Sequence, residues 1–385
     1  MKRNFWLAAL VGVALTGCVN EEVIPEANQK EALKFAAPVI ATQSRATVKG
    51  EITGVKYPSD ETFQVFSKIY SGSYAGWNAS TEDYFAAHGD VAKHEGGTYW
   101  STSTVYYWPD AGYNLAFAAY SPAELGEACT TAPTPTAITR TAAGIQITGF
   151  VSEPKSDDQY DLMYSHTVYD RNKSNNASQA VALKFEHALS SIVFSSQKSD
   201  AAVDYEITDL KVIGNFYTQG NFSQGITGAT TDDVYTETET PQWDLSTGAG
   251  VTTNVYYDPS FDSFNVPDAS PEIFTQGTSA ILVIPQDVPS DAKVHVTYKK
   301  TTNRITDTEG EIIDAGTTTT HIAEIFLKDF KKAAAEGTTV ADGIEAWERG
   351  KRYVYRIAFG ENQRIYFEPS VNDWVPEPTL IYTIK

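Results

Sequence analysis

The fold of this chain is decided by stretches such as Asn114-Leu115-Ala116-Phe117-Ala118-Ala119-Tyr120, whose side chains follow the two-residue period of a β-strand. Similar stretches occur at residues 63–66, 293–298 and 353–359, and turn-forming residues separate them; the chain contains 26 Gly and 17 Pro. A period of two is typical of strands, because successive side chains point to opposite faces of a sheet. The sequence therefore predicts an all-β fold of mostly antiparallel β-sandwiches with few short helices.

The length of 385 residues predicts two domains, since a domain typically takes about 100–200 residues. The Asn- and Ser-rich stretch at residues 171–179 is the best candidate for a boundary. We therefore expect an N-terminal sandwich over residues 46–180 and a C-terminal sandwich over residues 181–385. Short helical turns are expected only at residues 187–192 and 327–336.

The N-terminus has the organisation of a bacterial lipoprotein signal. Lys2 and Arg3 precede an apolar run at residues 5–15, which is too short to cross a bilayer, and Thr16-Gly17-Cys18 follows it. This order predicts a signal peptide over residues 1–17 and a lipid on Cys18; the alternative is an ordinary secretory signal with a chance cysteine. The polar residues after Cys18 predict a flexible linker.

The net charge of −20 limits the classes of partner. Loss of residues 1–17 would remove Lys2 and Arg3 and change the net charge to −22. Nucleic acids and anionic lipid surfaces are bound through patches of Lys and Arg, so we expect neither as a direct partner.

No catalytic or metal-binding motif is recognisable in the sequence. It contains no G-x-S-x-G, H-E-x-x-H, P-loop or paired C-x-x-C pattern. His187 lies beside apolar residues and is expected to be a structural histidine with its hydrogen bonds satisfied. Asp157, Asp158 and Asp161 lack the glycine and spacing of a calcium loop and are expected to form a solvated turn. We therefore predict no metal, no cofactor and no enzymatic activity; a glycoside hydrolase is an alternative for which no carboxylate pair stands out.

Aromatic residues are concentrated between residues 99 and 113. One interpretation is that Tyr99, Trp100 and Trp108 form a platform on which sugar rings stack. The other is that they pack across strands, with Pro109 ending a strand after Trp108. The second interpretation is favoured, because strands commonly use aromatic residues for packing.

Several short motifs together resemble the fimbrillin family of Bacteroidetes lipoproteins, the Mfa-like subunits of type V pili. They follow in order along the chain: Tyr106-Tyr107-Trp108-Pro109, Leu115-Ala116-Phe117-Ala118-Ala119-Tyr120-Ser121-Pro122, Tyr160-Asp161-Leu162-Met163-Tyr164, Phe185-Glu186-His187-Ala188-Leu189, Ile281-Leu282-Val283-Ile284-Pro285-Gln286, Trp347-Glu348-Arg349-Gly350-Lys351-Arg352-Tyr353-Val354-Tyr355 and Val371-Asn372-Asp373-Trp374. Their order, more than any single motif, carries the resemblance.

The resemblance implies two transthyretin-like β-sandwich domains and a role as a structural or adhesive fimbrial subunit. It implies export to the outer membrane and cell surface through the lipid anchor, and assembly with other fimbrial subunits. An Arg-specific protease would remove the first strand, and a strand from a neighbouring subunit would replace it. A host or bacterial surface ligand is a further expected partner. The runner-up function is that of a lipid-anchored surface glycan-binding protein.

Residues 18–45 are the segment that such processing would remove. Residues 32–42 read as a first strand with alternate residues on one face: Leu33, Phe35, Ala37, Val39 and Ala41. The resemblance places the cut between Arg45 and Ala46.

The last residues supply the candidate donor strand, residues 376–385. Leu380, Tyr382 and Ile384 share one face of an extended chain, and Pro376 and Pro378 separate them from Trp374. This tail of eleven residues after Trp374 is shorter than the C-terminal extensions of stalk subunits. A tip or accessory role therefore remains open, as does a final strand that pairs within its own domain.

Overall fold

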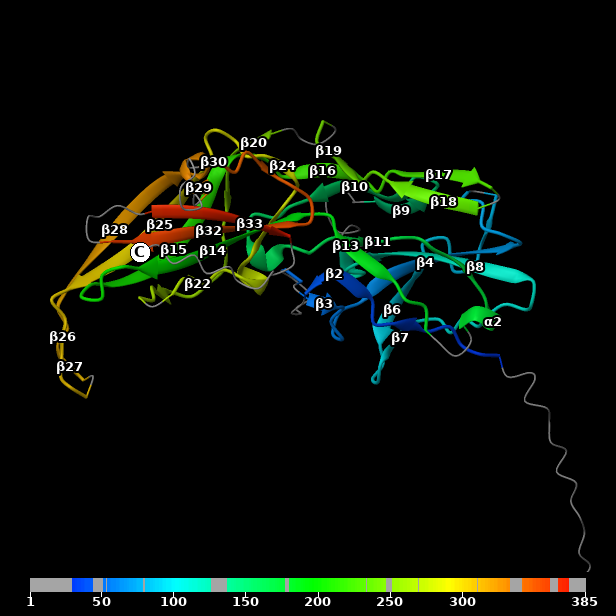
Figure 1. The fold of residues 1–385 in the computed structure, drawn as a ribbon, viewed down its shortest axis with the longest axis horizontal. Coiled ribbons are helices and arrows are strands. Elements are labelled where there is room, and N and C mark those ends of the chain that lie inside the picture. Colours follow the sequence, from blue (N-terminus) through cyan, green and yellow to red (C-terminus); the bar gives the residue numbers. More distant parts are fainter. Residues whose placement is uncertain are drawn as a thin grey trace, which may run out of the picture.

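The computed structural model describes most of the chain beyond its first residues. The described residues are 30–43, 51–52, 54–78, 80–125, 137–176, 180–232, 234–246, 251–268, 270–309, 311–332, 341–360 and 366–373. Figure 1 shows an elongated molecule, with the early strands gathered at one end and most of the late strands at the other. Among these residues no helix is long and apolar enough to cross a membrane. The predicted all-β sandwich fold is confirmed.

The first half of the chain builds one large sheet and part of a smaller one. The eleven-stranded sheet contains β1 (Phe35–Ala36), β2 (Val39–Gln43), β3 (Gly54–Lys56), β4 (Phe63–Ser71), β5 (Glu82–Asp83), β6 (Asp90–His94), β7 (Tyr99–Thr102), β8 (Tyr113–Ser121), β11 (Met163–Ser165), β12 (Val168–Arg171) and β13 (Lys184–His187). The four-stranded sheet contains β9 (Ala137–Thr141), β10 (Gly144–Val151), β16 (Gln219–Ser223) and β19 (Gln242–Asp244). The short helix α2 (Lys173–Asn176) and the 3-10 turn η2 (Ser156–Asp158) lie in the connections.

The second half forms two five-stranded sheets. One contains β14 (Ser190–Lys198), β22 (Glu272–Ile273), β23 (Ile281–Val283), β32 (Lys351–Phe359) and β33 (Tyr366–Asp373). The other contains β15 (Asp204–Tyr217), β20 (Val251–Tyr257), β21 (Phe264–Asn265), β25 (Lys293–Thr302) and β28 (Thr317–Phe326). The core between them includes Phe194, Phe216, Trp347 and Tyr355, all at most 1% exposed.

Short two-stranded ribbons and turns complete the described part. The ribbons are β17 (Ile226–Thr231) with β18 (Val234–Glu239), β24 (Gln286–Asp287) with β31 (Ala346–Trp347), β26 (Ile305–Thr306) with β27 (Ile312–Asp314), and β29 (Lys331–Lys332) with β30 (Ala341–Gly343). The remaining 3-10 turns are η3 (Gly277–Ser279) and η4 (Leu327–Asp329).

Of the two helical turns predicted from the sequence, the first is wrong and the second is confirmed only over residues 327–329. The stretch at 187–192 joins β13 to β14, and Ile192 pairs with Tyr353 of β32 instead of starting a helix. At 327–336 the structure has only η4 followed by β29, and residues 333–336 lie outside the described part. In the first case Ser190 and Ser191 begin the buried strand β14, and a stretch of six residues is too short for its period to distinguish a strand from a helix.

A long excursion of the chain ties the two ends of the molecule together. After β15, the strands β16 to β19 lie over the N-terminal end (Figure 1), and β16 pairs with β10. The Trp243 indole N–H donates to the carbonyl oxygen of Ala188 at 2.7 Å, which anchors β19 to the β13–β14 connection. The division into domains at residue 180 stays a prediction.

The ribbon β17–β18 is fastened by a partly buried ion cluster around His166. The two ring nitrogens of His166 lie 2.9 Å from Glu186 and 2.8 Å from Glu239, and Arg349 lies 3.2 Å from Glu186. Hydrogen bonds to these two carboxylates raise the pKa of His166 to about 9. The hydrogen bond from His166 is also the main cause that lowers the pKa of Glu186 to about 2.

These shifts predict how stability depends on pH. The contribution of His166 is fully present below its ordinary pKa of 6.5 and is lost as the pH rises through about 9. The contribution of Glu186 is present above its ordinary pKa of 4.5 and is lost as the pH falls through about 2. We expect His166→Gln to lower the free energy of unfolding at pH 6.5 and to have little effect above pH 9. Urea unfolding of both proteins across this range measures the difference, and a difference independent of pH would contradict the assignment.

Candidate functional site

The candidate site is formed by residues 30–43, which we name the first-strand segment. Its first part is hydrogen-bonded to the chain that follows β7. The Leu33 N–H donates to the carbonyl of Tyr106 at 2.8 Å, and the Trp108 N–H donates to the carbonyl of Glu31 at 3.0 Å. Further along, β1 pairs antiparallel with β7. On this side the segment therefore adds one strand to the sheet that contains β7.

The other side of β1 is bonded to residue 181, which precedes β13. The Ala36 N–H donates to the carbonyl of Val181 at 3.0 Å, and the Val181 N–H donates to the carbonyl of Lys34 at 2.8 Å. Within the eleven-stranded sheet, β1 is at one end of the pairing order and β2 is next to last at the other. Because β1 and β2 are consecutive in the chain, the first-strand segment links both ends of the sheet.

Three side chains of the segment are inserted into the hydrophobic core. Leu33, Phe35 and Ile40 are 3%, 0% and 1% exposed. The Phe35 ring makes edge contacts with Phe63, at 5.9 Å between ring centroids, and with Phe117, at 5.5 Å. The segment thus supplies part of the core of this sheet in addition to backbone pairing.

The segment is two short strands and not the single strand expected from its alternation. β1 ends at Ala36 and β2 begins at Val39, so the break contains Pro38, which has no N–H for a sheet ladder. Leu33 and Phe35 are buried, but Ala37 within the break is half-buried, and beyond the break the buried side chain is Ile40, which belongs to the other face of the expected strand. The side chains of Val39 and Ala41 lie outside the described part.

Strand β2 lies between two neighbours of opposite direction. It pairs parallel with β13, where Ile40 is opposite Phe185, and antiparallel with β3, where Val39 is opposite Lys56. The backbone of β2 is therefore paired with a neighbouring strand on each side. Loss of β2 would expose the facing edges of β13 and β3.

The predicted aromatic platform is largely buried. Trp100 and Trp108 are 3% and 7% exposed, whereas Tyr99 is 42% exposed. The Trp100 indole N–H donates to the carbonyl of Glu61 at 3.3 Å, and Trp100 is opposite Phe35 in the β1–β7 pairing. Two buried indoles cannot present open faces to a sugar, so this arrangement supports packing as the role of the aromatic residues. Trp100 and Trp108 lie against the first-strand segment.

Two predictions about polar residues near the site have opposite outcomes. The structural role of His187 is confirmed, because its Nδ1 lies 2.9 Å from Asp161 in a buried pair. The solvated turn is wrong for Asp161, which is 1% exposed and also accepts a hydrogen bond from the N–H of Ile52. Sequence reasoning missed this cluster because its members are 26 and 109 residues apart.

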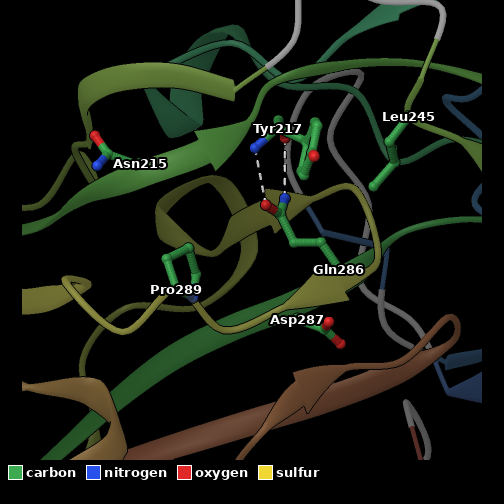
Figure 2. A pocket seen from close by; sticks show the side chains of 6 residues that line it. All are labelled: Asn215, Tyr217, Leu245, Gln286, Asp287 and Pro289. Atoms are coloured by element: carbon green, nitrogen blue, oxygen red, sulfur yellow. Dashed lines mark hydrogen bonds between the residues drawn. The ribbon is translucent and has the colours of Figure 1, made fainter.

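A shallow pocket of about 440 Å³ in the C-terminal half gives no competing site. Figure 2 shows that the Gln286 side chain faces the backbone of Tyr217. The Gln286 amide accepts from the Tyr217 N–H at 2.8 Å and donates to the Tyr217 carbonyl at 2.9 Å. Its hydrogen bonds are therefore used within the fold. No group of three or more potential metal ligands occurs among the described residues.

The remaining predicted site residues lie outside the described part of the chain. They are Cys18, Arg45, Ala46, Leu380, Tyr382 and Ile384. Their roles stay predictions. The described chain nevertheless ends at Gln43 and resumes at Glu51, so the predicted cut falls in the connection between the first-strand segment and the rest of the molecule.

The fold and site define a β-sandwich protein whose N-terminal segment completes one of its own sheets. Residues 59–374 match the family described as fimbrillin-like, and the chain belongs to this family. Membership assigns it a structural or adhesive role among the subunits of cell-surface fimbriae. No match was found among curated proteins.

One solved fimbrial protein resembles the chain in fold, and two further solved structures align with most of it at lower TM-scores. A fimbrial protein from Bacteroides vulgatus is 17% identical with a TM-score of 0.54, over 89% of this chain and 100% of the other. A putative cell adhesion protein from Bacteroides uniformis is 14% identical with a TM-score of 0.43, over 90% and 99%. The tip fimbrial protein Mfa3 from Porphyromonas gingivalis, with a C-terminal truncation, is 9% identical with a TM-score of 0.35, over 88% and 99%.

The burial of Phe35 predicts a large effect on stability. Phe35→Ala should lower the free energy of unfolding by about 3–5 kcal/mol, because it removes a fully buried ring and leaves a cavity. Lys34→Ala is the matched control, because the Lys34 side chain is exposed and its ammonium group lies 5.8 Å from the centre of the Tyr99 ring. This substitution should lower the free energy of unfolding by less than about 1 kcal/mol. Denaturant unfolding measures both, and equal effects would contradict the described insertion of Phe35.

Proposed function

We propose that this chain is a fimbrial subunit that is exported as a lipoprotein through Cys18, processed after Arg45 and assembled by donor-strand exchange. The observation that carries the proposal is the position of the first-strand segment. It is paired along both sides, inserts Leu33 and Phe35 into the core, and has its connection to the body at the predicted cut. A segment that completes a sheet is suited to replacement by another strand.

The energetics require an incoming strand of comparable apolar content. Burial of Leu33, Phe35 and Ile40 contributes about 1.5–3 kcal/mol for each side chain, or about 5–9 kcal/mol together. The segment remains bound after a cut unless another strand supplies similar packing, because its contacts do not depend on the covalent link. Cleavage therefore permits exchange, and the competing strand drives it.

The C-terminal tail has a spacing that fits this site. Leu380 and Tyr382 are two residues apart, as are Leu33 and Phe35, and both pairs place an aliphatic side chain before an aromatic one. In this register Ile384 takes the place of Ala37. We therefore propose that the tail of one subunit enters the site of the next with Tyr382 in the position of Phe35.

Processing at Arg45 is tested by substitution. We expect Arg45→Ala to abolish the new N-terminus at Ala46 and the oligomers that form after treatment with an Arg-specific protease. Lys30→Ala, at an exposed position of the same segment, should leave both unchanged. N-terminal sequencing and gels of unboiled samples measure these outcomes. Oligomers that persist in Arg45→Ala would exclude processing at this bond as the trigger.

The register of the tail is tested with synthetic peptides of residues 374–385 and the cleaved protein. Tyr382→Ala should weaken binding by about 100-fold or more, which corresponds to about 3 kcal/mol for an aromatic ring that loses its buried position. Tyr382→Phe should bind like the natural peptide, and Thr383→Ala, on the other face, should change affinity less than about threefold. Fluorescence anisotropy measures these affinities. Greater sensitivity at residue 383 than at residue 382 would overturn the proposed register.

A further inference from the structure

A buried polar cluster holds the chain just after the predicted cut. We name it the junction cluster, and its members are Glu51, Ile52, Asp161, His187, Ser191 and Arg352. It lies where the chain passes from β13, which ends at His187, to β14, which contains Ser191. It therefore joins the large N-terminal sheet to a sheet of the second half.

Glu51 is fixed through both its side chain and its backbone. Its carboxylate accepts a hydrogen bond from the Ser191 hydroxyl at 2.6 Å and lies 3.1 Å from Nε of Arg352. Its N–H donates to the carbonyl of Gly277 at 3.0 Å. Glu51 is 0% exposed, so this charged pair is shielded from water.

Ile52 is fixed through its backbone. Its N–H donates to Oδ2 of Asp161 at 2.8 Å, and Oδ1 of Asp161 lies 2.9 Å from Nδ1 of His187. The Asp161 and His187 side chains are 0% and 2% exposed. None of these contacts involves the first-strand segment.

The chain beyond β3 is fixed by Tyr57, whose backbone N–H donates to the carbonyl of Pro38 in the first-strand segment at 3.0 Å and whose side chain has partners outside it. The Tyr57 hydroxyl donates to the carbonyl of Thr62 at 2.7 Å and is hydrogen-bonded to the Ser121 hydroxyl at 2.7 Å. Its ring stacks on Phe185 of β13, with 5.5 Å between ring centroids. Strand β3 is thus held at both ends by contacts that would remain if β2 were removed.

We infer that the junction cluster and Tyr57 hold β3 in place after cleavage, so that the space left by β2 keeps both of its edges when the segment is replaced. This inference rests on the proposed function. With β2 between them, β3 and β13 are two strand spacings apart, about 9.6 Å. For β3 to close this space, Ile52 would have to leave Asp161 and Glu51 would have to leave Arg352. That movement is opposed because it separates the buried carboxyl group of Glu51 from Arg352 and leaves the Ile52 N–H without its partner.

The same arrangement fixes the direction of the incoming strand. β2 runs parallel to β13 and antiparallel to β3, and both neighbours keep their directions when they are held in place. A strand that pairs with both in the same ladders must follow the direction of β2. The junction cluster therefore acts on assembly by positioning an acceptor strand, without contact to the donor.

The test is hydrogen exchange of the full chain before and after Arg-specific cleavage and addition of the tail peptide of residues 374–385. In the proposed register this peptide ends at the position of Pro38, so it displaces the segment and leaves the space of β2 empty. In the natural protein, the N–H groups of Glu51 and Ile52 should keep their protection after cleavage, because their partners Gly277 and Asp161 lie outside the segment. In Glu51→Ala the two N–H groups should be protected while the chain is intact, because β2 still pairs with β3, and should exchange at least about tenfold faster once the segment leaves. Glu309→Gln, in the exposed turn of β26–β27, is the matched control and should behave like the natural protein.

The outcomes separate this inference from the proposed function. If the segment leaves but the N–H groups of Glu51 and Ile52 lose protection in the natural protein, the positioning role is overturned while strand exchange stands. If Glu51→Ala loses protection equally before cleavage, the cluster has only a structural role and the inference is also overturned. If Glu51→Ala does not fold, the same comparison of protection before and after cleavage is made between Glu51→Gln and the natural protein. If the segment never leaves after cleavage at Arg45, the proposed function fails and the inference fails with it.

Discussion

The insertion of Phe35 between Phe63 and Phe117 is the interaction on which the N-terminal half depends. Its backbone is paired with β7 on one side, and the adjoining residues are bonded to Val181 on the other. A short segment thereby completes both the hydrogen-bond ladder and the core. Apolar packing is non-directional, so another side chain of similar size could fill the same position.

The first-strand segment and the junction cluster are held by different kinds of interaction, and this difference suits different roles. The segment contributes three buried apolar side chains, which a strand of similar composition can replace. The junction cluster contributes a buried carboxylate against Arg352 and another against His187. Such pairs depend on particular partners and are costly to break. The segment that we propose to be exchanged and the fixed part of the chain are thus separated by residues 44–50, which contain the predicted cut.

The sequence was sufficient to predict strands, sandwiches and the burial of Leu33 and Phe35, because these follow from local alternation. It was insufficient for the change of buried face after Pro38, which depends on two different neighbouring strands. The pairing of Asp161 with Ile52 and the excursion of β16 to β19 are long-range, so no local pattern encodes them. Trp100 and Trp108 were ambiguous for the same reason, since burial is decided by the strand that covers them.

The central claim is that the first-strand segment can be exchanged after cleavage without unfolding of the rest. Native mass spectrometry of the protein cleaved at Arg45 and mixed with an isotopically labelled peptide of residues 30–43 tests it most directly. We expect a folded complex in which the labelled peptide replaces the original segment, and no such replacement in the uncleaved protein. Release of the segment together with global unfolding, or retention of the original segment in the presence of excess peptide, would contradict it.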